Sequence, residues 1–209
     1  MARYVGSICH LCRRCGDKLM LKGSRCMTPK CAMERKRRAQ ATGTRGRRRR
    51  VSERGIQLIE KQKARCTYGI MERQFRRFFE MAEKQPGVTG DSLKVMLEKR
   101  LDNVVYRLAL AESRAQARQI VLHGHITING KKVSICSYLV KEGDTIAVKE
   151  ASTKNEYFKK VLEEIKSRTI PAWLTLDREK LAGQVVSQPM LDDATIKFDS
   201  KSIVEYYSR

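Results

Sequence analysis

Apolar residues after position 50 recur every three or four positions, which is the spacing of buried helix faces. Ser52 is placed to cap a first helix, and a second is predicted over residues 68–84, before Gln85-Pro86-Gly87. Asp91 is placed to cap a third. The apolar stripe of this third stretch is regular: Leu93, Leu97, Leu101, Val104 and Leu108. The pattern predicts helices packed through these stripes.

The next stretch predicts a helix followed by a β-hairpin. Ser113 and Gln116 have the spacing of a capping box, and Gly124 is placed to end the helix that they start. Residues 125–128 then alternate like a half-buried strand. Asn129-Gly130 is the strongest short-range signal for a tight hairpin turn. We therefore expect one compact helix–hairpin unit.

The rest of the chain mixes the two periodicities. Strands are predicted at residues 135–140, 145–148, 173–176 and 183–186, and an amphipathic helix at residues 152–168. The expected fold class is therefore α+β, with a small, mainly antiparallel sheet packed against helices.

Three regions are expected along the chain. Residues 1–50 form a metal-binding N-terminal region and basic arm, and residues 51–97 form an all-helical domain. Residues 98–189 form the domain that contains the sheet. Residues 190–209 end on apolar side chains, so we expect them to pack on the helical domain.

Charge points to a polyanionic partner. The chain has 44 Lys and Arg against 23 Asp and Glu, a formal net charge of +21. Residues 1–50 alone carry 16 basic and 2 acidic residues, which gives +14. Such an excess opposes compactness unless a polyanion balances it, so nucleic acid is the leading partner. No small-molecule substrate is expected.

A membrane is the weaker partner. We find no apolar run near the ~18 residues that span a bilayer, and no helix with a basic face opposite an exposed aromatic face. The N-terminus lacks the apolar segment of a signal peptide. We therefore expect a cytoplasmic location.

Clustered cysteines indicate a metal site. Cys9-x-x-Cys12 and Cys26-x4-Cys31 are two pairs separated by 13 residues, close to the spacing of structural zinc sites. The surrounding region has few large apolar residues, so a metal would supply its folding free energy. Cys15 complicates the pattern, because Cys9, Cys12 and Cys15 also resemble part of an iron–sulfur run. Zinc is preferred, an iron–sulfur cluster is the alternative, and Cys15 is a possible substitute ligand.

Basic residues on and around the helix–hairpin unit are the candidate nucleic-acid contacts, because Arg and Lys on a rigid frame recognise phosphates. The expected contacts in and near the unit are Arg100, Arg107, Arg114, Arg118, His123, His125, Lys131 and Lys132. The contacts expected to extend them are Arg3, Arg13, Arg14, Arg47, Arg48, Arg49, Arg50, Lys61, Lys63, Arg65, Arg73 and Arg76.

Several motifs together resemble one family. They are Leu97-Glu98-x-Arg100-Leu101-Asp102-Asn103-Val104-Val105-Tyr106-Arg107, Ser113-Arg114-x-x-Ala117-Arg118-Gln119, Gly124-His125-Ile126-x-x-Asn129-Gly130-x-x-Val133, Trp173-Leu174 and the ending Val204-Glu205-x-Tyr207-Ser208-Arg209. The first three resemble the S4 RNA-binding domain. The whole set is similar to the S4 family of bacterial small-subunit ribosomal proteins.

This resemblance implies a non-enzymatic ribosome component. Family membership implies direct binding of small-subunit rRNA early in assembly, nucleation of the body of the subunit, and an influence on decoding accuracy. It also implies a position beside ribosomal protein S5, near the mRNA entry channel. Cys9, Cys12, Cys26 and Cys31 match the zinc-binding branch of the family, whereas Cys15 does not belong to its pattern.

Two other function classes compete with this interpretation. An enzyme that uses such a domain as an RNA handle, such as a pseudouridine synthase or a tyrosyl-tRNA synthetase, needs a catalytic domain, and we find no phosphate-binding glycine loop or catalytic pair. A zinc-finger DNA regulator needs a recognition helix after the cysteines, where this chain has an aperiodic basic arm.

Overall fold

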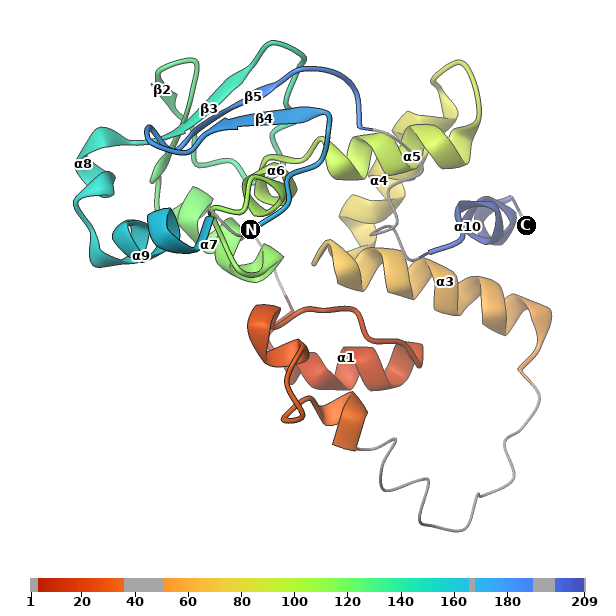
Figure 1. Ribbon diagram of the computed structural model, residues 1–209. Helices are drawn as coiled ribbons and strands as arrows, with labels where there is room; N and C mark the ends of the chain where they lie inside the picture. The colour runs from red at the N-terminus through yellow and green to blue at the C-terminus, as the bar shows by residue number, and fades with distance from the viewer. Residues whose placement is uncertain (1–3, 36–50, 166–167, 190–197, 209) are drawn as a thin grey trace. The chain divides into compact units, whose positions relative to one another are not determined.

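The computed structural model describes residues 4–35, 51–165, 168–189 and 198–208. The chain packs into two compact units, residues 1–94 with 192–209 and residues 95–191 (Figure 1). In the described part of the chain, no helix is both long enough and apolar enough to cross a membrane.

The first unit is helical. Its elements are α1 (Ile8–Cys15), the short 3-10 helix η1 (Gly23–Cys26), α3 (Glu53–Thr67), α4 (Glu72–Glu83), the start of α5 (Thr89–Glu98) and α10 (Ser200–Tyr207). The Ser52 hydroxyl accepts a hydrogen bond from the Gly55 amide, which confirms the predicted cap of α3. The second predicted helix starts later than expected, at Glu72, because Gly69 takes a φ of 63° and separates α3 from α4.

The C-terminal helix α10 packs on α3 within this unit. Gln57 of α3 donates a 2.9 Å hydrogen bond to Glu205 of α10. The Tyr207 hydroxyl donates a 3.0 Å bond to Glu72, and the rings of Tyr207 and Phe79 lie 4.5 Å apart. These contacts attach the C-terminal helix α10 to α3 and α4.

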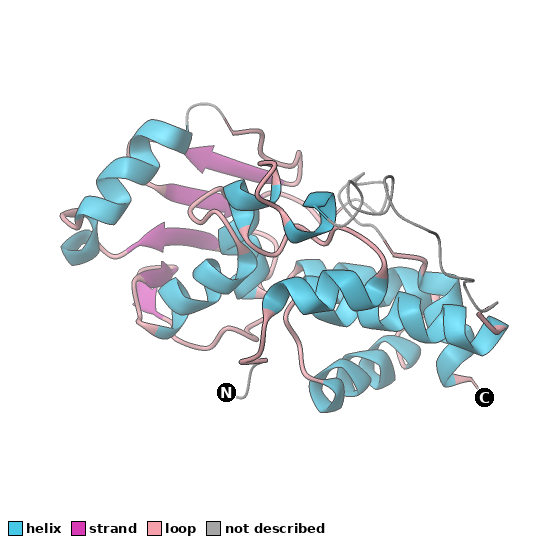
Figure 2. Cartoon of the chain, turned by 90° about the horizontal axis from the view of Figure 1, so that it is seen from below, coloured by secondary structure: helices cyan, strands magenta, loops and turns pink. Residues whose placement is uncertain are grey.

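The second unit is a sheet with helices on one face (Figures 1 and 2). Its helices are the end of α5, α6 (Leu101–Arg107), α7 (Arg114–Leu122), α8 (Glu150–Thr153) and α9 (Glu156–Glu164). Its strands are β1 (Ile126–Ile128), β2 (Lys131–Lys132), β3 (Thr145–Val148), β4 (Leu174–Asp177) and β5 (Ala182–Val185). They pair antiparallel in the order β2-β1-β3-β5-β4. The expected α+β class is confirmed.

One core joins the helices to the sheet in this unit. The buried residues include Leu101 from α6, Leu108 just after it, Ile146 from β3, Phe158 from α9 and Trp173 beside β4. The predicted stripe from Leu93 to Leu108 is buried throughout, but it belongs to two helices, since the extended residue Arg100 separates α5 from α6.

Two predicted elements were wrong. Residues 135–140 form no strand beyond a single bridge between Leu139 and Arg100. Their carbonyls instead accept from the first amides of α6, as in the 2.8 Å bond from Leu101 to Tyr138, because those amides have no partner within the helix. The single helix predicted at residues 152–168 is split into α8 and α9, with Asn155 at the start of α9.

Candidate nucleic-acid interface and cysteine cluster

Local sequence signals build the helix–hairpin unit as predicted. The Ser113 hydroxyl accepts from the Gln116 amide at 3.3 Å, and the Gln116 side chain accepts from the Glu112 amide at 3.0 Å. Gly124 takes a φ of 73° just after α7. Asn129 and Gly130 both take positive φ, which a tight hairpin turn of this kind requires. The result is a rigid path from α7 through β1 to the lysines of β2.

This path brings four basic side chains together. The rings of His123 and His125 lie 6.1 Å apart, and the side chain of Lys132 passes directly over Gly124. A Cβ atom at Gly124 would lie 2.2 Å from the Lys132 Cε atom, so the lysine side chain would have to move, and the φ of 73° itself favours glycine there. Lys149 completes the group, which we call the histidine–lysine cluster (His123, His125, Lys132 and Lys149).

The pKa of His125 reflects the positive charges of its neighbours in this cluster. Burial lowers the pKa of His125 most, and the nearby His123, Lys132 and Lys149 lower it further. Its Nδ1 atom lies 2.9 Å from the Ser152 hydroxyl, which fixes the ring. Within the described residues, neither Lys132 nor Lys149 forms an ion pair with a carboxylate. The cluster therefore presents positive charge that an external anion can balance.

Sequence reasoning missed Lys149. The register of β1 against β3 pairs Ile126 with Val148, and the Lys149 amide donates a 2.8 Å bond to the His125 carbonyl. Lys149, the residue after β3, therefore lies beside His125, the residue before β1. The basic residue after the strand was visible in the sequence, but its place depends on the pairing.

Three side chains that the sequence predicted as RNA contacts are buried inside the second unit. Arg100 is fully buried and makes two bonds to Asp102, of 3.0 and 2.7 Å. Arg118 is also buried, with its Nη1 atom 3.5 Å from Asp102. Arg107 is buried and makes bonds of 2.8 and 2.9 Å to Glu98. Because all three side chains are buried and pair with the carboxylates of Asp102 and Glu98, these arginines support the fold and are not retained as RNA contacts.

Arg114 lies at the edge of this network. Its Nε atom donates a 2.8 Å bond to the Asn103 side chain, whose amide nitrogen donates a 2.8 Å bond to Glu98. Its guanidinium also lies 4.6 Å from the centre of the Tyr106 ring. Arg114 is only half-buried, so it stays a candidate contact with a fixed orientation.

Two lysines of α3 that the sequence predicted as RNA contacts form ion pairs within the first unit. Lys61 is buried, 2.6 Å from Glu72, and stacks over the Tyr206 ring. Lys63 lies 2.5 Å from Asp17 and 2.6 Å from Glu60. Both lysines therefore hold helices together. Their neighbour Arg65 is half-buried and lies 3.7 Å from Glu72.

The remaining basic candidates divide into exposed residues and residues outside the described ranges. Arg13, Arg14, Arg73, Arg76, His123, Lys131 and Lys132 are exposed. Arg3, Arg47, Arg48, Arg49 and Arg50 lie outside the described residues.

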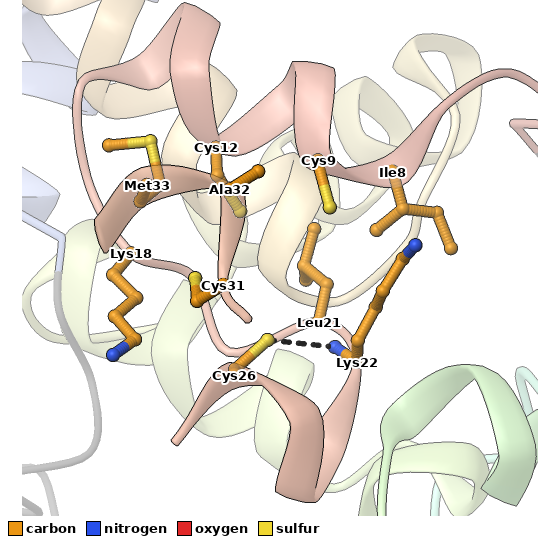
Figure 3. Close-up of a pocket in the computed structure, with 10 residues that line it drawn as sticks. All are labelled: Ile8, Cys9, Cys12, Lys18, Leu21, Lys22, Cys26, Cys31, Ala32 and Met33. Atoms are coloured by element: carbon orange, nitrogen blue, oxygen red, sulfur yellow. Dashed lines mark hydrogen bonds between the residues drawn. The ribbon is translucent and has the colours of Figure 1, made fainter. Parts of the chain in front are cut away.

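Four of the predicted metal ligands line one pocket (Figure 3). Cys9 and Cys12 come from α1, Cys26 from η1 and Cys31 from the segment after it. Burial raises the pKa of the Cys12 thiol, and the nearness of Cys26, Cys9 and Cys31 raises it further. The Lys22 amide donates a 3.3 Å bond to the Cys26 sulfur, as backbone amides do at thiolate ligands.

The donor set fits a soft, tetrahedral metal such as zinc: four thiols from three chain segments, beside apolar neighbours. Among the residues that the structure describes, no three His, Cys, Asp or Glu side chains are gathered tightly enough to hold an ion as they stand. Cys15 does not line this pocket. It lies instead in a buried apolar cluster that also contains Cys66 of α3.

Together, the fold and the open basic cluster define a nucleic-acid-binding protein built on a helix–hairpin domain. Residues 99–146 match the family described as S4 domain, and residues 3–98 match the family described as Ribosomal protein S4/S9 N-terminal domain.

Relatives that match along the whole chain are small ribosomal subunit proteins of one kind, named uS4. The chain is 53% identical to small ribosomal subunit protein uS4 of Dehalococcoides mccartyi, 55% to that of Halothermothrix orenii and 54% to that of Pelotomaculum thermopropionicum. Each match covers 100% of both chains. The chain therefore belongs to the uS4 family of small ribosomal subunit proteins, a family of structural, rRNA-binding ribosome components without enzymatic activity. The resemblance inferred from the motifs is confirmed.

Proposed function

We propose that this chain is a structural constituent of the small ribosomal subunit that binds small-subunit rRNA through the histidine–lysine cluster. The observation that carries the proposal is the convergence of His123, His125, Lys132 and Lys149, for which the described residues supply no carboxylate partner. Structured RNA offers phosphates, 2′-hydroxyls and a shallow minor groove, which basic side chains on a rigid frame can bind.

Further contacts extend this surface. Lys131 is exposed at the hairpin beside Lys132, and Arg114 is held in place by Asn103. In the first unit, the exposed Arg13, Arg14, Arg73 and Arg76 stay proposed contacts. Arg65, which is half-buried, also stays proposed. Arg3 and Arg47 to Arg50 are proposed from the sequence alone.

The family suggests a finer role. We propose that the chain binds rRNA early in assembly and nucleates the body of the subunit, within cytoplasmic ribosomes. We further propose that it contacts ribosomal protein S5 near the mRNA entry channel and influences decoding accuracy there. Order-of-addition reconstitution would test this role, because an early binder must be present before later proteins can bind.

Competition between ligands tests the proposed function against a DNA regulator. A folded small-subunit rRNA fragment should displace labelled rRNA from the chain at a concentration at least ~10-fold lower than duplex DNA of equal length at 0.15 M salt does. Equal competition by the two nucleic acids would mean that the chain binds polyanions without recognising RNA shape.

The pH dependence of RNA binding should depend on His125. Its pKa is lowered by burial and by positive neighbours, whereas a bound phosphate favours the charged ring. Binding therefore takes up a proton, and RNA affinity should increase as the pH falls from about 7 to about 5, by at most ~10-fold per pH unit. In the same window the free protein should lose stability, because its unfolded state binds that proton more readily.

The variant His125→Gln isolates this effect from protonation of the RNA itself. Its RNA affinity, measured by fluorescence anisotropy across the same pH range, should change less steeply than that of the wild type. Identical slopes for the two proteins would remove His125 from the interface.

We also propose that Cys9, Cys12, Cys26 and Cys31 hold a structural zinc ion. Cys12→Ser is expected to reduce the zinc content from about one ion per chain to a small fraction, because a four-thiolate site has no spare ligand. Cys136→Ser is the matched control, since Cys136 is a buried thiol in the other unit that donates to the Arg118 carbonyl.

Elemental analysis with a visible absorbance spectrum makes this measurement. Cys15→Ser should retain its zinc, because Cys15 does not line the pocket. Brown iron–sulfide absorbance in the purified protein, or loss of metal from Cys15→Ser, would contradict the four-cysteine zinc site.

A further inference from the structure

Arg114 occupies a position at which helix stability does not explain a basic side chain. It is the first residue of α7, directly after the capping residue Ser113, and the first turn of this helix contains no acidic residue. A cation at the start of a helix is disfavoured by the helix dipole, whose positive end lies there. The arginine therefore adds to a positive potential, which an external anion can balance.

Two contacts from α6 hold the Arg114 side chain in one orientation. Its Nε atom donates a 2.8 Å bond to Asn103 Oδ1, and its guanidinium carbon lies 4.6 Å from the centre of the Tyr106 ring. Arg114 and Tyr106 are both half-buried, so the arginine lies at the surface although it is held from below. The guanidinium is planar and rigid, so fixing Nε and one face also fixes the directions of the terminal Nη donors.

Asn103 is itself fixed by a buried carboxylate. It is 1% exposed, and its Nδ2 atom donates bonds of 2.8 Å to the Glu98 carboxylate and 3.0 Å to the Glu98 carbonyl. Both of these groups accept hydrogen bonds and the Arg114 guanidinium only donates them, so a single orientation of the Asn103 amide makes all three bonds. Arg107 holds Glu98 in turn with bonds of 2.8 and 2.9 Å. A chain of bonds therefore runs from a buried ion pair through Asn103 to the surface arginine.

We propose that Asn103 is a positioning residue for RNA binding, which holds Arg114 in the orientation that binds a phosphate group of the RNA backbone. This inference rests on the proposed function, because Arg114 begins the helix–hairpin unit that also carries the histidine–lysine cluster. A phosphate is the expected ligand, since a guanidinium donates two parallel hydrogen bonds to two of its oxygens.

Asn103 acts without touching the RNA, because its side chain is buried. A long side chain that moves freely must be ordered when its ligand binds, and this ordering lowers the affinity. The bond from Asn103 orders Arg114 before the RNA arrives, so less conformational entropy is lost on binding. A purely structural role for Asn103 would instead change the stability of the second unit and leave the affinity of the folded chain unchanged.

The first test replaces Asn103 by Leu, which has a similar size but makes none of the three bonds, and leaves Arg107 paired with Glu98. The affinity of the full-length chain for a labelled, folded small-subunit rRNA fragment should fall roughly 2- to 10-fold. The slope of log affinity against log salt should not change, because Arg114 keeps its charge. Arg114→Ala should lower the affinity and also make that slope less steep by about 1. Filter binding over a range of salt concentrations measures both quantities.

A double variant shows whether Asn103 acts through Arg114. Asn103→Leu combined with Arg114→Ala should bind the RNA like Arg114→Ala alone, because no arginine is left to position. Val105→Ala is the matched control, since Val105 is fully buried on the same helix and its truncation lowers stability without touching the chain of bonds. It should leave the RNA affinity unchanged, and the fluorescence of Trp173 checks that each variant is folded under the binding conditions.

Arg114→Lys tests the same claim without disturbing a buried residue. Lysine keeps the charge but has neither the Nε donor nor the rigid fork, so the affinity should again fall roughly 2- to 10-fold with an unchanged salt slope. Wild-type affinity in Asn103→Leu or in Arg114→Lys would overturn the proposal, as would an equal effect of Asn103→Leu with and without Arg114. Wild-type affinity in Arg114→Ala, with a loss in the Lys132 and Lys149 double variant, would reject the positioning role and leave the proposed function standing.

Discussion

Replacing Glu98 by Ala is expected to lower the free energy of unfolding of the second unit by about 3–5 kcal/mol, a large part of the stability of such a domain. The Glu98 carboxylate is buried and accepts bonds from Arg107 and Asn103. Its removal leaves the Arg107 guanidinium buried without its carboxylate. The cost of an uncompensated buried charge exceeds that of the lost hydrogen bonds alone.

Urea unfolding followed by tryptophan fluorescence measures this loss of stability in the second unit. Trp173 is the single tryptophan of the chain, and it is 1% exposed in the core of the second unit. Glu142→Ala is the matched control, because Glu142 lies exposed in a turn and should change stability by less than ~0.5 kcal/mol. A loss below ~1 kcal/mol for Glu98→Ala would show that the buried network is not essential to this fold.

Replacing Lys132 and Lys149 together by Ala is expected to lower the affinity for small-subunit rRNA roughly 10- to 100-fold at low salt. Each lysine flanks His125 and lacks an ion-pair partner among the described residues. If each binds a phosphate, the slope of log affinity against log salt should become less steep by about 2. Filter binding over a range of salt concentrations gives both quantities.

The matched control removes the same charge elsewhere in the same unit. Lys159 and Lys160 are exposed on α9, and neither contributes to the lowered pKa of His125. Lys159→Ala with Lys160→Ala should change the affinity no more than net charge alone requires, roughly 2- to 3-fold. An equal loss of affinity in both double variants would mean that binding follows total charge and has no defined centre.

Local signals explain what could be predicted. Capping by Ser113, the helix end at Gly124 and the Asn129-Gly130 turn each act within a few residues, so the helix–hairpin unit was visible in the sequence. The hydrophobic stripes likewise identified the buried side of each helix, although not the break at Arg100.

Long-range pairing explains what could not be predicted. The sequence does not distinguish a basic residue that faces water from one that pairs with a buried carboxylate. Arg107 pairs with Glu98 only because α5 and α6 are separate helices. Lys149 reaches the interface through strand pairing. Cys66 had no visible partner in the sequence, and the packing of α1 on α3 places it in a buried apolar cluster with Cys15.

The most direct test of the account is lysine acetylation, followed by mass spectrometry, of the full-length chain with and without small-subunit rRNA. We predict that Lys132 and Lys149 lose most of their reactivity when the RNA is bound, whereas Lys159 and Lys160 keep theirs. Unchanged reactivity of Lys132 and Lys149 in the bound complex would contradict the claim that the histidine–lysine cluster is the centre of RNA recognition.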